Sequence, residues 1–435
     1  MKTKQETIYA LSTPPGKSAI AVVRISGERS YNCLKNISLN MPTKPNKATT
    51  NKIVDEQGDT IDKTVTTYFK KPKSYTGEDM VEVSLHGGPA VIEKFIKTLL
   101  INKNIRQAEP GEFTRRSFEN NKLDLTQVEA VADIVNAETE AQRIQAHNQL
   151  AGIFSKKTKE IYKKTKKLLA NIESLIDFTD EDLPKNLVNR IKEQNKNIIT
   201  SIDKVLETGN VGKKIRTGFS VGIIGKTNVG KSSFINSISN QNIAIVTKIP
   251  GTTTDVIESF VDIDGIPVKF YDTAGIRKPK RMIEKIGIKK SILISKKSDL
   301  NIVFIEKSSE IKDYSRLNRV IFVQSKYDIR KKPIKSKEIL NISSKTKHGF
   351  KKLIKTISKE LVNKQHPENF YISRERHRLC FISAKKHLSK KLSMQQLDIY
   401  AEDIRLALKE ISKIYGRVDI EEILDIVFKE FCIGK

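Results

Sequence analysis

The residues with the clearest chemistry form one run, Gly225 to Ser233, which reads GKTNVGKSS. This run fits the pattern Gly, any four residues, Gly, Lys, then Ser or Thr, which binds a phosphate chain. Glycines let the backbone approach the phosphates, and N–H groups at the start of the following helix point at the anion. We expect Lys231 to contact the outer phosphates and the Ser232 hydroxyl to bind Mg²⁺.

Two further motifs follow in the order that nucleotide hydrolysis needs. The first, PGTTTD at Pro250–Asp255, can offer the Thr253 hydroxyl to Mg²⁺ and its N–H to a γ-phosphate, as switch loops do. The second, DTAG, begins with Asp272, which can bind the metal, and ends with Gly275, whose N–H can bind the γ-phosphate. Three motifs in this order predict a P-loop GTPase-type domain.

Base recognition is expected from a later element of the form Asn-Lys-x-Asp. The sequence VQSKYD supplies Lys326 and Asp328, and the Asp328 carboxylate can accept two N–H bonds from guanine. Ser325 stands where Asn is expected, and loss of the amide should weaken nucleotide binding by about 1 kcal/mol. The SSK stretch, Ser343–Lys345, is an acceptable closing loop for the base. We therefore expect guanine specificity.

The attacking water has two candidate positioning residues. Ile276 follows DTAG, where Ras-type switches carry a Gln that orients water. Glu284 and Arg277 lie shortly downstream and are possible substitutes. Chemistry alone leaves open the alternative that both are ordinary surface charges.

Composition excludes several classes of protein. The chain has 435 residues, 38% hydrophobic and 30% charged, which is typical of a globular protein with several domains. No apolar run approaches the roughly 18 residues that span a bilayer, and the N-terminus lacks the apolar core of a signal peptide. The three cysteines, Cys33, Cys380 and Cys432, lack metal-ligand spacing. We expect a cytoplasmic protein without membrane segments, disulfides or zinc.

The charge balance favours a polyanionic partner. The formal net charge is +28, and between Ile276 and Glu360 there are 25 Lys and Arg against 8 Asp and Glu, a net of +17. Phosphate backbones are bound largely by such side chains. A solvated basic surface is the alternative.

Secondary structure must position these motifs. Ser220–Ile224 reads as a strand before the phosphate-binding run, and Phe234, Ile235 and Ile238 continue it as a helix. Val268–Tyr271 reads as the strand that delivers DTAG. The nucleotide motifs therefore belong to an α/β domain.

The first 120 residues read as α+β. Ile20–Ile25 and Met80–Leu85 have strand patterns, while Lys35–Thr60 is polar and predicts an exposed connection. Arg24 and Glu82 interrupt the two strands, and they either pair with each other or bind a ligand. The stretch from Pro110 to Leu125 shows no catalytic constellation.

Two helical blocks flank the nucleotide motifs. Helical periodicity runs from Leu125 to about Leu206 with a break at Pro184, and returns from Ser373 to Phe431. We expect a multidomain α/β and α protein, in which both blocks form one helical domain and the GTPase domain is inserted. The predicted boundaries are an α+β domain at 1–120, helical parts at 121–215 and 366–435, and a P-loop domain at 216–365.

Taken together, the sequence resembles the MnmE (also called TrmE) family of tRNA-modification GTPases. The resemblance lies in TPPG and RISG near the start, TGED with HGG, PGEFTRRSF with NKLDL, the GTPase motifs and the final FCIGK. It runs essentially end to end. The N-terminal motifs and FCIGK are the most specific parts, because other GTPases lack them.

The resemblance implies that residues 1–120 form a folate-binding and dimerisation domain. The ligand would be 5-formyl- or methylene-tetrahydrofolate, bound by residues matching Arg24, Glu82, Lys122 and the C-terminal Lys435. An arginine suits a folate carboxylate, and a carboxylate suits the N–H edge of a pterin. The ligand alternative for Arg24 and Glu82 thereby gains a chemical identity.

The resemblance also implies K⁺ in place of an arginine finger, held at Asn228, Thr247, Ile249 and Thr252, and a catalytic Glu at Glu284. The Mg²⁺ ligands would be Ser232 and Thr253. The GTP-binding positions indicated by the motifs and the resemblance are Asn228, Val229, Gly230, Lys231, Ser232, Ser233, Thr247, Lys248, Ile249, Pro250, Gly251, Thr252, Thr253, Asp272, Thr273, Ala274, Gly275, Lys326 and Asp328.

The implied function is modification of carbon 5 of the wobble uridine of certain tRNAs. The implied partners are a second copy of the chain and a flavin-dependent MnmG-like protein, together forming a heterotetramer, with folate supplying the one-carbon unit and glycine or ammonium the amine. Cys432 is interpreted as structural, because no base is placed beside it. A ribosome-assembly GTPase that binds rRNA is the alternative. A signalling GTPase with protein partners alone fits the basic region less well.

Overall fold

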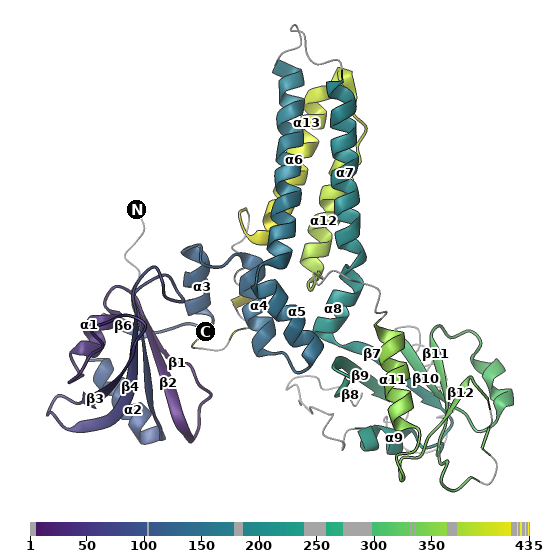
Figure 1. Cartoon of the computed structure of the whole chain (residues 1–435), viewed down its shortest axis with the longest axis horizontal. Coiled ribbons are helices and arrows are strands. Elements are labelled where there is room, and N and C mark those ends of the chain that lie inside the picture. The colour runs from purple at the N-terminus through teal and green to yellow at the C-terminus, as the bar shows by residue number, and fades with distance from the viewer. Residues whose placement is uncertain are drawn as a thin grey trace, which may run out of the picture. The chain divides into compact units, whose positions relative to one another are not determined.

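The computed structural model (Figure 1) describes most of the chain. The described residues are 6–101, 104–177, 186–238, 258–272, 298–330, 333–334, 336–362, 372–418, 424, 427–428, 431 and 434. The chain divides into two units: residues 1–132 with 411–435, and residues 133–410.

The first unit contains a six-stranded sheet of order β3-β4-β5-β2-β1-β6. Its strands are β1 (Thr7–Leu11), β2 (Ser18–Ser26), β3 (Ala48–Val54), β4 (Thr60–Phe69), β5 (Met80–Gly87) and β6 (Ile105–Gln107). All pairs are antiparallel except β1 with β6. Alternating residues of β2 and β5, such as Val23, Ile25 and Val83, are buried. The predictions of strands at Ile20–Ile25 and Met80–Leu85 are thus confirmed.

The prediction of an exposed connection over Lys35–Thr60 is wrong. This stretch contains β3, which pairs antiparallel with β4. Its buried face carries Asn51 and Ile53, and the Asn51 amide donates to the hydroxyls of Ser38 and Thr66 at 3.1 and 3.3 Å. Hydrogen-bonded polar side chains can occupy a buried strand face, so the strand lacks the apolar alternation that would reveal it.

The helices of the first unit are α1 (Ser30–Lys35), α2 (Pro89–Leu99), α3 (Glu112–Glu119) and α4 (Leu125–Val135). Residues close to the C-terminus pack on α4: Leu424, Val427, Phe428 and Phe431 form one buried cluster with Leu125, Val128 and Ala132. The Ser12 hydroxyl donates to the Gly434 carbonyl at 3.2 Å. Distant parts of the sequence therefore build this unit together.

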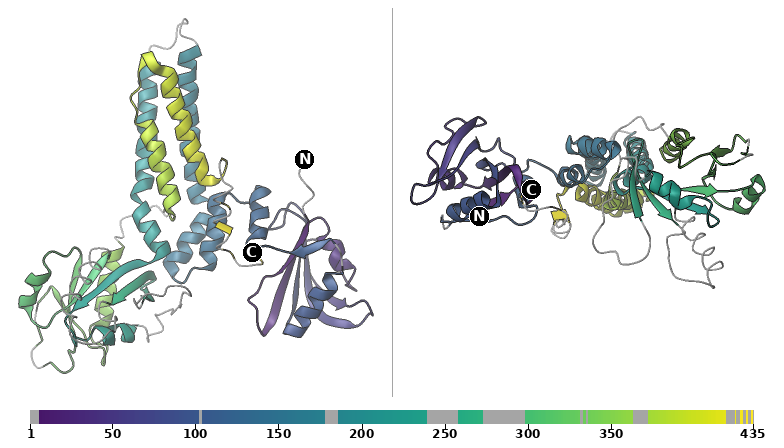
Figure 2. Two further views of the ribbon diagram at one scale, coloured as in Figure 1. Left: turned by 180° about the vertical axis from the view of Figure 1, so that it is seen from behind. Right: turned by 90° about the horizontal axis from the view of Figure 1, so that it is seen from below.

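The second unit contains a long helical bundle (Figures 1 and 2). Its helices are α5 (Glu140–Leu150), α6 (Ile153–Asp177), α7 (Leu187–Glu207), α8 (Gly209–Thr217), α12 (Glu375–Leu388) and α13 (Leu397–Tyr415), and the short 3₁₀ helix η3 (Met394–Gln396) precedes α13. The Asn195 amide of α7 donates to the Leu388 carbonyl at 2.8 Å and to the Tyr400 hydroxyl of α13 at 3.0 Å. Helices from both sequence blocks pack together, which confirms the predicted discontinuous helical domain.

The nucleotide motifs lie in a second six-stranded sheet, of order β12-β11-β10-β7-β9-β8. Its strands are β7 (Phe219–Gly225), β8 (Glu258–Ile263), β9 (Ile266–Asp272), β10 (Leu300–Phe304), β11 (Val320–Gln324) and β12 (Ile339–Asn341). All neighbours are parallel except β8 and β9, which form a hairpin. The predictions of strands at Ser220–Ile224 and Val268–Tyr271 are confirmed.

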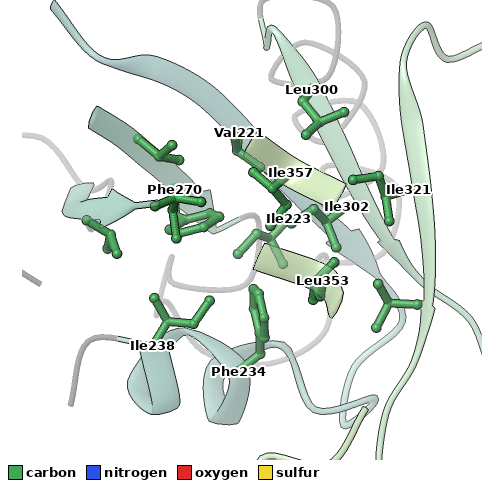
Figure 3. Close-up of a cluster of buried hydrophobic side chains, with 14 of the residues drawn as sticks. Val221, Ile223, Phe234, Ile238, Phe270, Leu300, Ile302, Ile321, Leu353 and Ile357 are labelled. Carbon is green, nitrogen blue, oxygen red and sulfur yellow. The ribbon is translucent and has the colours of Figure 1, made fainter. Parts of the chain in front are cut away.

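Helices α9 (Lys231–Ile238) and α11 (Phe350–Leu361) cover this sheet, with a 3₁₀ helix η2 (Ser308–Tyr314) between β10 and β11. Figure 3 shows part of the core, with Phe234 of α9 and Phe270 of β9 among its side chains. The ring of Phe234 lies against Phe270, Phe304 and Phe350 at centroid distances of 5.5 to 6.0 Å. Such aromatic contacts add to apolar burial. The start of α9, where the phosphate-binding run ends, is therefore anchored on three neighbouring elements.

The bundle contacts the sheet through α5. Thr139 caps this helix by accepting the Gln142 N–H, and the Ala141 N–H donates to the Gly265 carbonyl of the β8–β9 turn at 3.0 Å. None of the helices in the described part of the chain is long and apolar enough to cross a membrane. Over the same residues, no three His, Cys, Asp or Glu side chains gather closely enough to hold a metal ion.

Candidate nucleotide-binding site

The phosphate-binding run forms the turn between β7 and α9, and residues 226–230 are named the phosphate loop here. β7 is central in a parallel sheet, so its carboxyl end faces the crevice where α/β folds bind ligands. Asn228 and Gly230 adopt positive φ angles of 60° and 100°, which curl the loop back toward the sheet.

Lys231 points back into this turn. Its side chain is buried at 5% exposure, and its Nζ donates to the carbonyls of Gly225 at 2.6 Å and Lys226 at 2.5 Å. Charged phosphate oxygens are stronger acceptors than carbonyls, so an anion in the loop can take over these bonds. Ser232 and Ser233 follow at the first turn of α9 and are exposed. The residues present thus suit a phosphate chain.

A second lysine of the run has a different environment. The Lys226 ammonium is exposed and forms an ion pair with Glu310 of η2 at 2.9 Å, which raises the pKa of Lys226. This partner comes from the segment after β10, and no motif in the sequence points to it. Lys226 is therefore held outside the turn that encloses Lys231.

The predicted base-recognition residues follow β11, and residues 325–328 are named the base loop here. Ser325 Oγ donates to the Val229 carbonyl, and Lys326 Nζ donates to the Asn228 carbonyl at 2.7 Å. The base loop is therefore bonded directly to the phosphate loop. Sequence reasoning treated Ser325 only as a lost amide and missed this contact.

The predicted closing loop reaches Asp328. The Ser343 hydroxyl donates to Asp328 Oδ1 at 2.7 Å, and the Thr346 N–H donates to the Ser343 oxygen at 3.1 Å. The ring of Tyr327 stacks on His348 at a centroid distance of 4.1 Å. Asp328 is thereby held in one orientation, which suits a carboxylate that must accept two parallel N–H bonds.

The switch predictions fall largely outside the described residues. Asp272 ends β9, and its backbone pairs with Ile223 in β7, which brings the start of DTAG beside the strand that leads into the phosphate loop. The predicted residues outside the described ranges are Thr247, Lys248, Ile249, Pro250, Gly251, Thr252, Thr253, Thr273, Ala274, Gly275, Ile276, Arg277, Glu284, Cys432 and Lys435.

Arg24 and Glu82 are neighbours on β2 and β5. Arg24 Nε lies 2.7 Å from Glu82 Oε1, each side chain is 26% exposed, and the guanidinium lies 5.8 Å from the centre of the Tyr75 ring. The alternative in which the two charges pair with each other is present in the structure. The two charges therefore lie in one place, as a shared ligand site requires.

Lys122 is the second residue of NKLDL, the stretch that leads into α4. Its Nζ donates to the Pro72 carbonyl at 2.8 Å and its stem packs on Gly77. Pro72, Tyr75 and Gly77 belong to one loop, so this loop contacts both Lys122 and Arg24. The structure thus relates two of the predicted folate residues through a shared segment.

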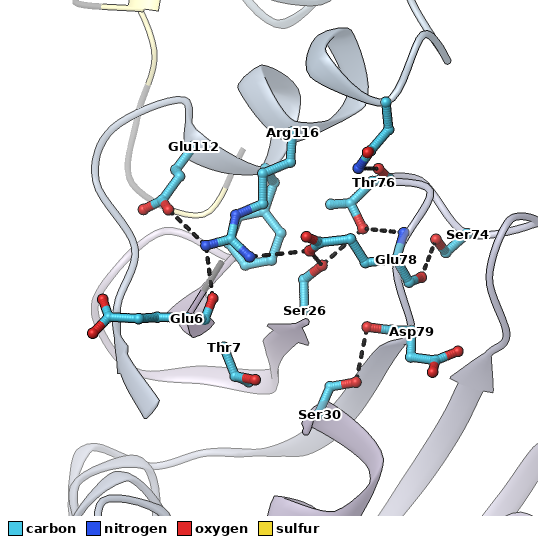
Figure 4. A network of polar contacts seen from close by, with 12 residues as sticks. Glu6, Thr7, Ser26, Ser30, Ser74, Thr76, Glu78, Asp79, Glu112 and Arg116 are labelled. Carbon is cyan, nitrogen blue, oxygen red and sulfur yellow. Dashed lines mark hydrogen bonds and ion pairs between the residues drawn. The ribbon is translucent and has the colours of Figure 1, made fainter. Parts of the chain in front are cut away.

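Three N-terminal motifs meet in one polar network (Figure 4). Arg116 of PGEFTRRSF, 3% exposed, contacts Glu78 of TGED at 3.0 Å and Glu112 at 2.9 Å, and donates to the Glu6 carbonyl at 2.8 Å. Ser26 of RISG donates to Glu78 at 2.8 Å. Sequence reasoning found no role for Arg116, because the partners are distant in sequence. The network fastens the TGED loop to α3.

The network strongly favours the charged form of Glu112. Burial by itself raises the pKa of Glu112, but hydrogen bonds from Arg106, the Glu109 backbone and Arg116 outweigh burial and lower the pKa to about 2.

Gly111, the residue before Glu112, has a φ of 72°, and a Cβ there would lie 2.7 Å from Phe428. The glycine of PGEF therefore allows close packing against Phe428.

Comparison with known proteins covers the whole chain. The family described as "GTP-binding protein TrmE N-terminus" matches residues 7–122, and the family described as "MnmE helical domain" matches residues 125–432. Proteins named tRNA modification GTPase MnmE are similar throughout: those of Pelagibacter ubique, Dinoroseobacter shibae and Aquifex aeolicus are 41%, 37% and 38% identical. Each match covers 99% of this chain and 100% of the relative.

Solved structures add only a weak likeness. The G domain of the T. maritima FeoB iron transporter matches 33% of this chain and 99% of its own, with 21% identity and a TM-score of 0.26, too low to bear on the fold. The family matches and the full-length relatives are sufficient to assign the family without this structure. On their strength, this chain belongs to the MnmE family.

Proposed function

We propose that this chain hydrolyses GTP and acts, with a flavin-dependent MnmG-like partner, in modifying carbon 5 of the wobble uridine of certain tRNAs. The names of its full-length relatives support tRNA modification and GTPase activity. The observation that carries the proposal is the phosphate loop, with Lys231 buried inside the turn and the base loop bonded to its carbonyls.

Different residues have different proposed roles in binding and hydrolysing GTP. Lys231 and the N–H groups at the start of α9 hold the phosphates, and Asp328, oriented by Ser343, accepts the N–H groups of guanine. Ser232 and Thr253 are the proposed Mg²⁺ ligands, and Glu284 positions water. Bound Mg²⁺ and K⁺ would supply positive charge at the β- and γ-phosphates.

The hydrolysis rate is expected to depend on the alkali cation. Asn228 lies in the phosphate loop at a positive φ, and together with Thr247, Ile249 and Thr252 it is the proposed K⁺ site. Because charge develops on the phosphates in the transition state, K⁺ should accelerate hydrolysis over Na⁺ by about tenfold to a hundredfold. Steady-state phosphate release in matched chloride salts measures this. Asn228→Ala should reduce the difference, and equal rates in Na⁺ and K⁺ would contradict the assignment.

Folate binding is expected to depend on Arg24. We propose that Arg24, Glu82, Lys122 and Lys435 bind a formyl- or methylene-tetrahydrofolate. Arg24→Ala removes a charged donor and should weaken binding of 5-formyltetrahydrofolate by about tenfold or more, measured by calorimetry. Lys63→Ala on neighbouring β4, whose side chain is exposed, is the control and should leave affinity unchanged. Unchanged affinity in Arg24→Ala, with unaltered thermal unfolding, would remove Arg24 from the site.

The cellular role is tested by nucleoside analysis. Cells that lack this protein should lose the carbon-5 substituent of wobble uridine in the affected tRNAs, and the gene restored with Lys231→Ala should not bring it back. A ribosome-assembly role predicts instead normal wobble nucleosides and accumulated ribosomal precursors. That alternative leaves the N-terminal unit, matched to the TrmE N-terminus, without a task. We also propose that the chain forms a homodimer and acts in the cytoplasm.

A further inference from the structure

We propose that Ser325 links the base loop to the phosphate loop through its hydroxyl group. Because the hydroxyl donates its only proton to this contact, position 325 has no side-chain donor left for the N7 and O6 edge of guanine. This inference rests on the proposed GTP binding. It assigns Ser325 a positioning role, and it makes Asp328 the residue on which base choice depends.

The contact between the two loops has two parallel parts. Ser325, 4% exposed, donates from Oγ to the Val229 carbonyl, and the next residue, Lys326, donates to the preceding carbonyl, that of Asn228, at 2.7 Å. A Cβ at Gly230 would lie 2.8 Å from Ser325 Oγ. Two consecutive residues of one loop thus hold two consecutive carbonyls of the other, and a glycine makes room for them.

The backbone behind Ser325 is also fixed. Arg330 Nε donates to the Ser325 carbonyl at 2.9 Å, and the Tyr327 N–H donates to the Ile342 carbonyl at 3.0 Å. The hydroxyl therefore starts from a held position. Because Ser325 and Val229 are both buried, water has little access to this contact.

The number of protons that the side chain at position 325 can donate determines which acceptors it can serve. A serine hydroxyl has one proton, whereas an asparagine amide has two. An amide at this position can serve the Val229 carbonyl and also an acceptor such as guanine N7, but the hydroxyl can serve only one of them. Since the Ser325 proton lies on the Val229 carbonyl, recognition rests on the opposite edge of the base, where Asp328 accepts N–H groups.

The first test uses the unmodified chain. Affinities for GDP and for 7-deaza-GDP, which replaces N7 by a carbon, are measured by calorimetry. Without a donor to N7 the two affinities should agree within about twofold. A preference for GDP of fivefold or more would overturn the inference. A chain that binds neither nucleotide would overturn the proposed function together with it, whereas binding of GDP with strong discrimination overturns this inference alone.

The second test changes Ser325. Ser325→Ala should weaken both nucleotides equally, by about fivefold, because the contact between the loops is lost. Ser325→Asn should retain the contact and gain a preference of about fivefold for GDP over 7-deaza-GDP. Ser309→Ala, an exposed serine of the same domain, is the matched control and should change neither affinity. Native affinity in Ser325→Ala would remove the positioning role, and thermal unfolding without nucleotide identifies a variant that fails to fold.

Discussion

Replacing Lys231 with alanine is expected to lower the rate of GTP hydrolysis by about a hundredfold or more. The Lys231 ammonium is buried inside the turn between β7 and α9 and donates to the carbonyls of Gly225 and Lys226, so it lies where an anion in the phosphate loop would bind. In a site of low dielectric, a donor aimed at developing charge contributes several kcal/mol to transition-state stabilisation, roughly 3 to 4 in measured cases. Phosphate release at saturating GTP measures the change.

The same run provides the matched control. Lys226→Ala removes an identical side chain five residues earlier, but the Lys226 ammonium is exposed and paired with Glu310 outside the turn. Its loss should change the rate by no more than a few fold. Equal losses in the two variants would show that the two lysines are equivalent, contrary to the assigned roles. Binding of GDP, measured alongside, separates loss of catalysis from loss of the loop.

Replacing Arg116 with methionine is expected to destabilise the N-terminal unit by about 3 kcal/mol, because Glu78 loses its arginine partner and the Glu6 carbonyl loses its donor, while Glu112 keeps Arg106. The side chain is 3% exposed and contacts both Glu78 and Glu112. Since a chain of several domains does not unfold in one step, hydrogen exchange of amides in β2, β5 and α3 is the suitable measurement.

The preceding residue, Arg115, serves as the comparison. Arg115→Met removes an arginine of the same helix that is 44% exposed and pairs with Glu119 one turn away, so the change should stay within about 0.5 kcal/mol. Acid provides a second readout. The pKa of Glu112 is about 2 in the folded chain and lies near 4.5 without these contacts, so its stabilisation is present above about pH 5 and is lost as pH falls toward 2. Comparable exchange in the Arg116 and Arg115 variants would contradict a structural role for the network.

The sequence predicts well what is local in the chain. The phosphate-binding run, its strand and its helix are contiguous, and the apolar alternation of Val81, Val83 and Leu85 identifies β5. Contacts that only the tertiary fold creates are not predicted from the sequence. β3 was missed because its buried Asn51 is satisfied by Ser38 and Thr66, which only the fold brings near.

Contacts between residues distant in the sequence also explain why the roles of Arg116 and Ser325 were not predicted. Arg116 needs Glu78, 38 residues away, and Ser325 needs Val229, 96 residues away, to make sense of their chemistry. Between β10 and β11 the described chain has the 3₁₀ helix η2 and no α-helix. The switch residues and the domain boundaries stay predictions.

The packing of Phe428 and Phe431 onto α4 has a consequence for biosynthesis. Leu125 and Val128 emerge from the ribosome early, but the side chains that cover them are made only after the residues of the entire second unit. The apolar face of α4 therefore stays uncovered until the ribosome has passed through the second unit. Completion of the first unit is in this sense delayed until the second unit has been synthesised.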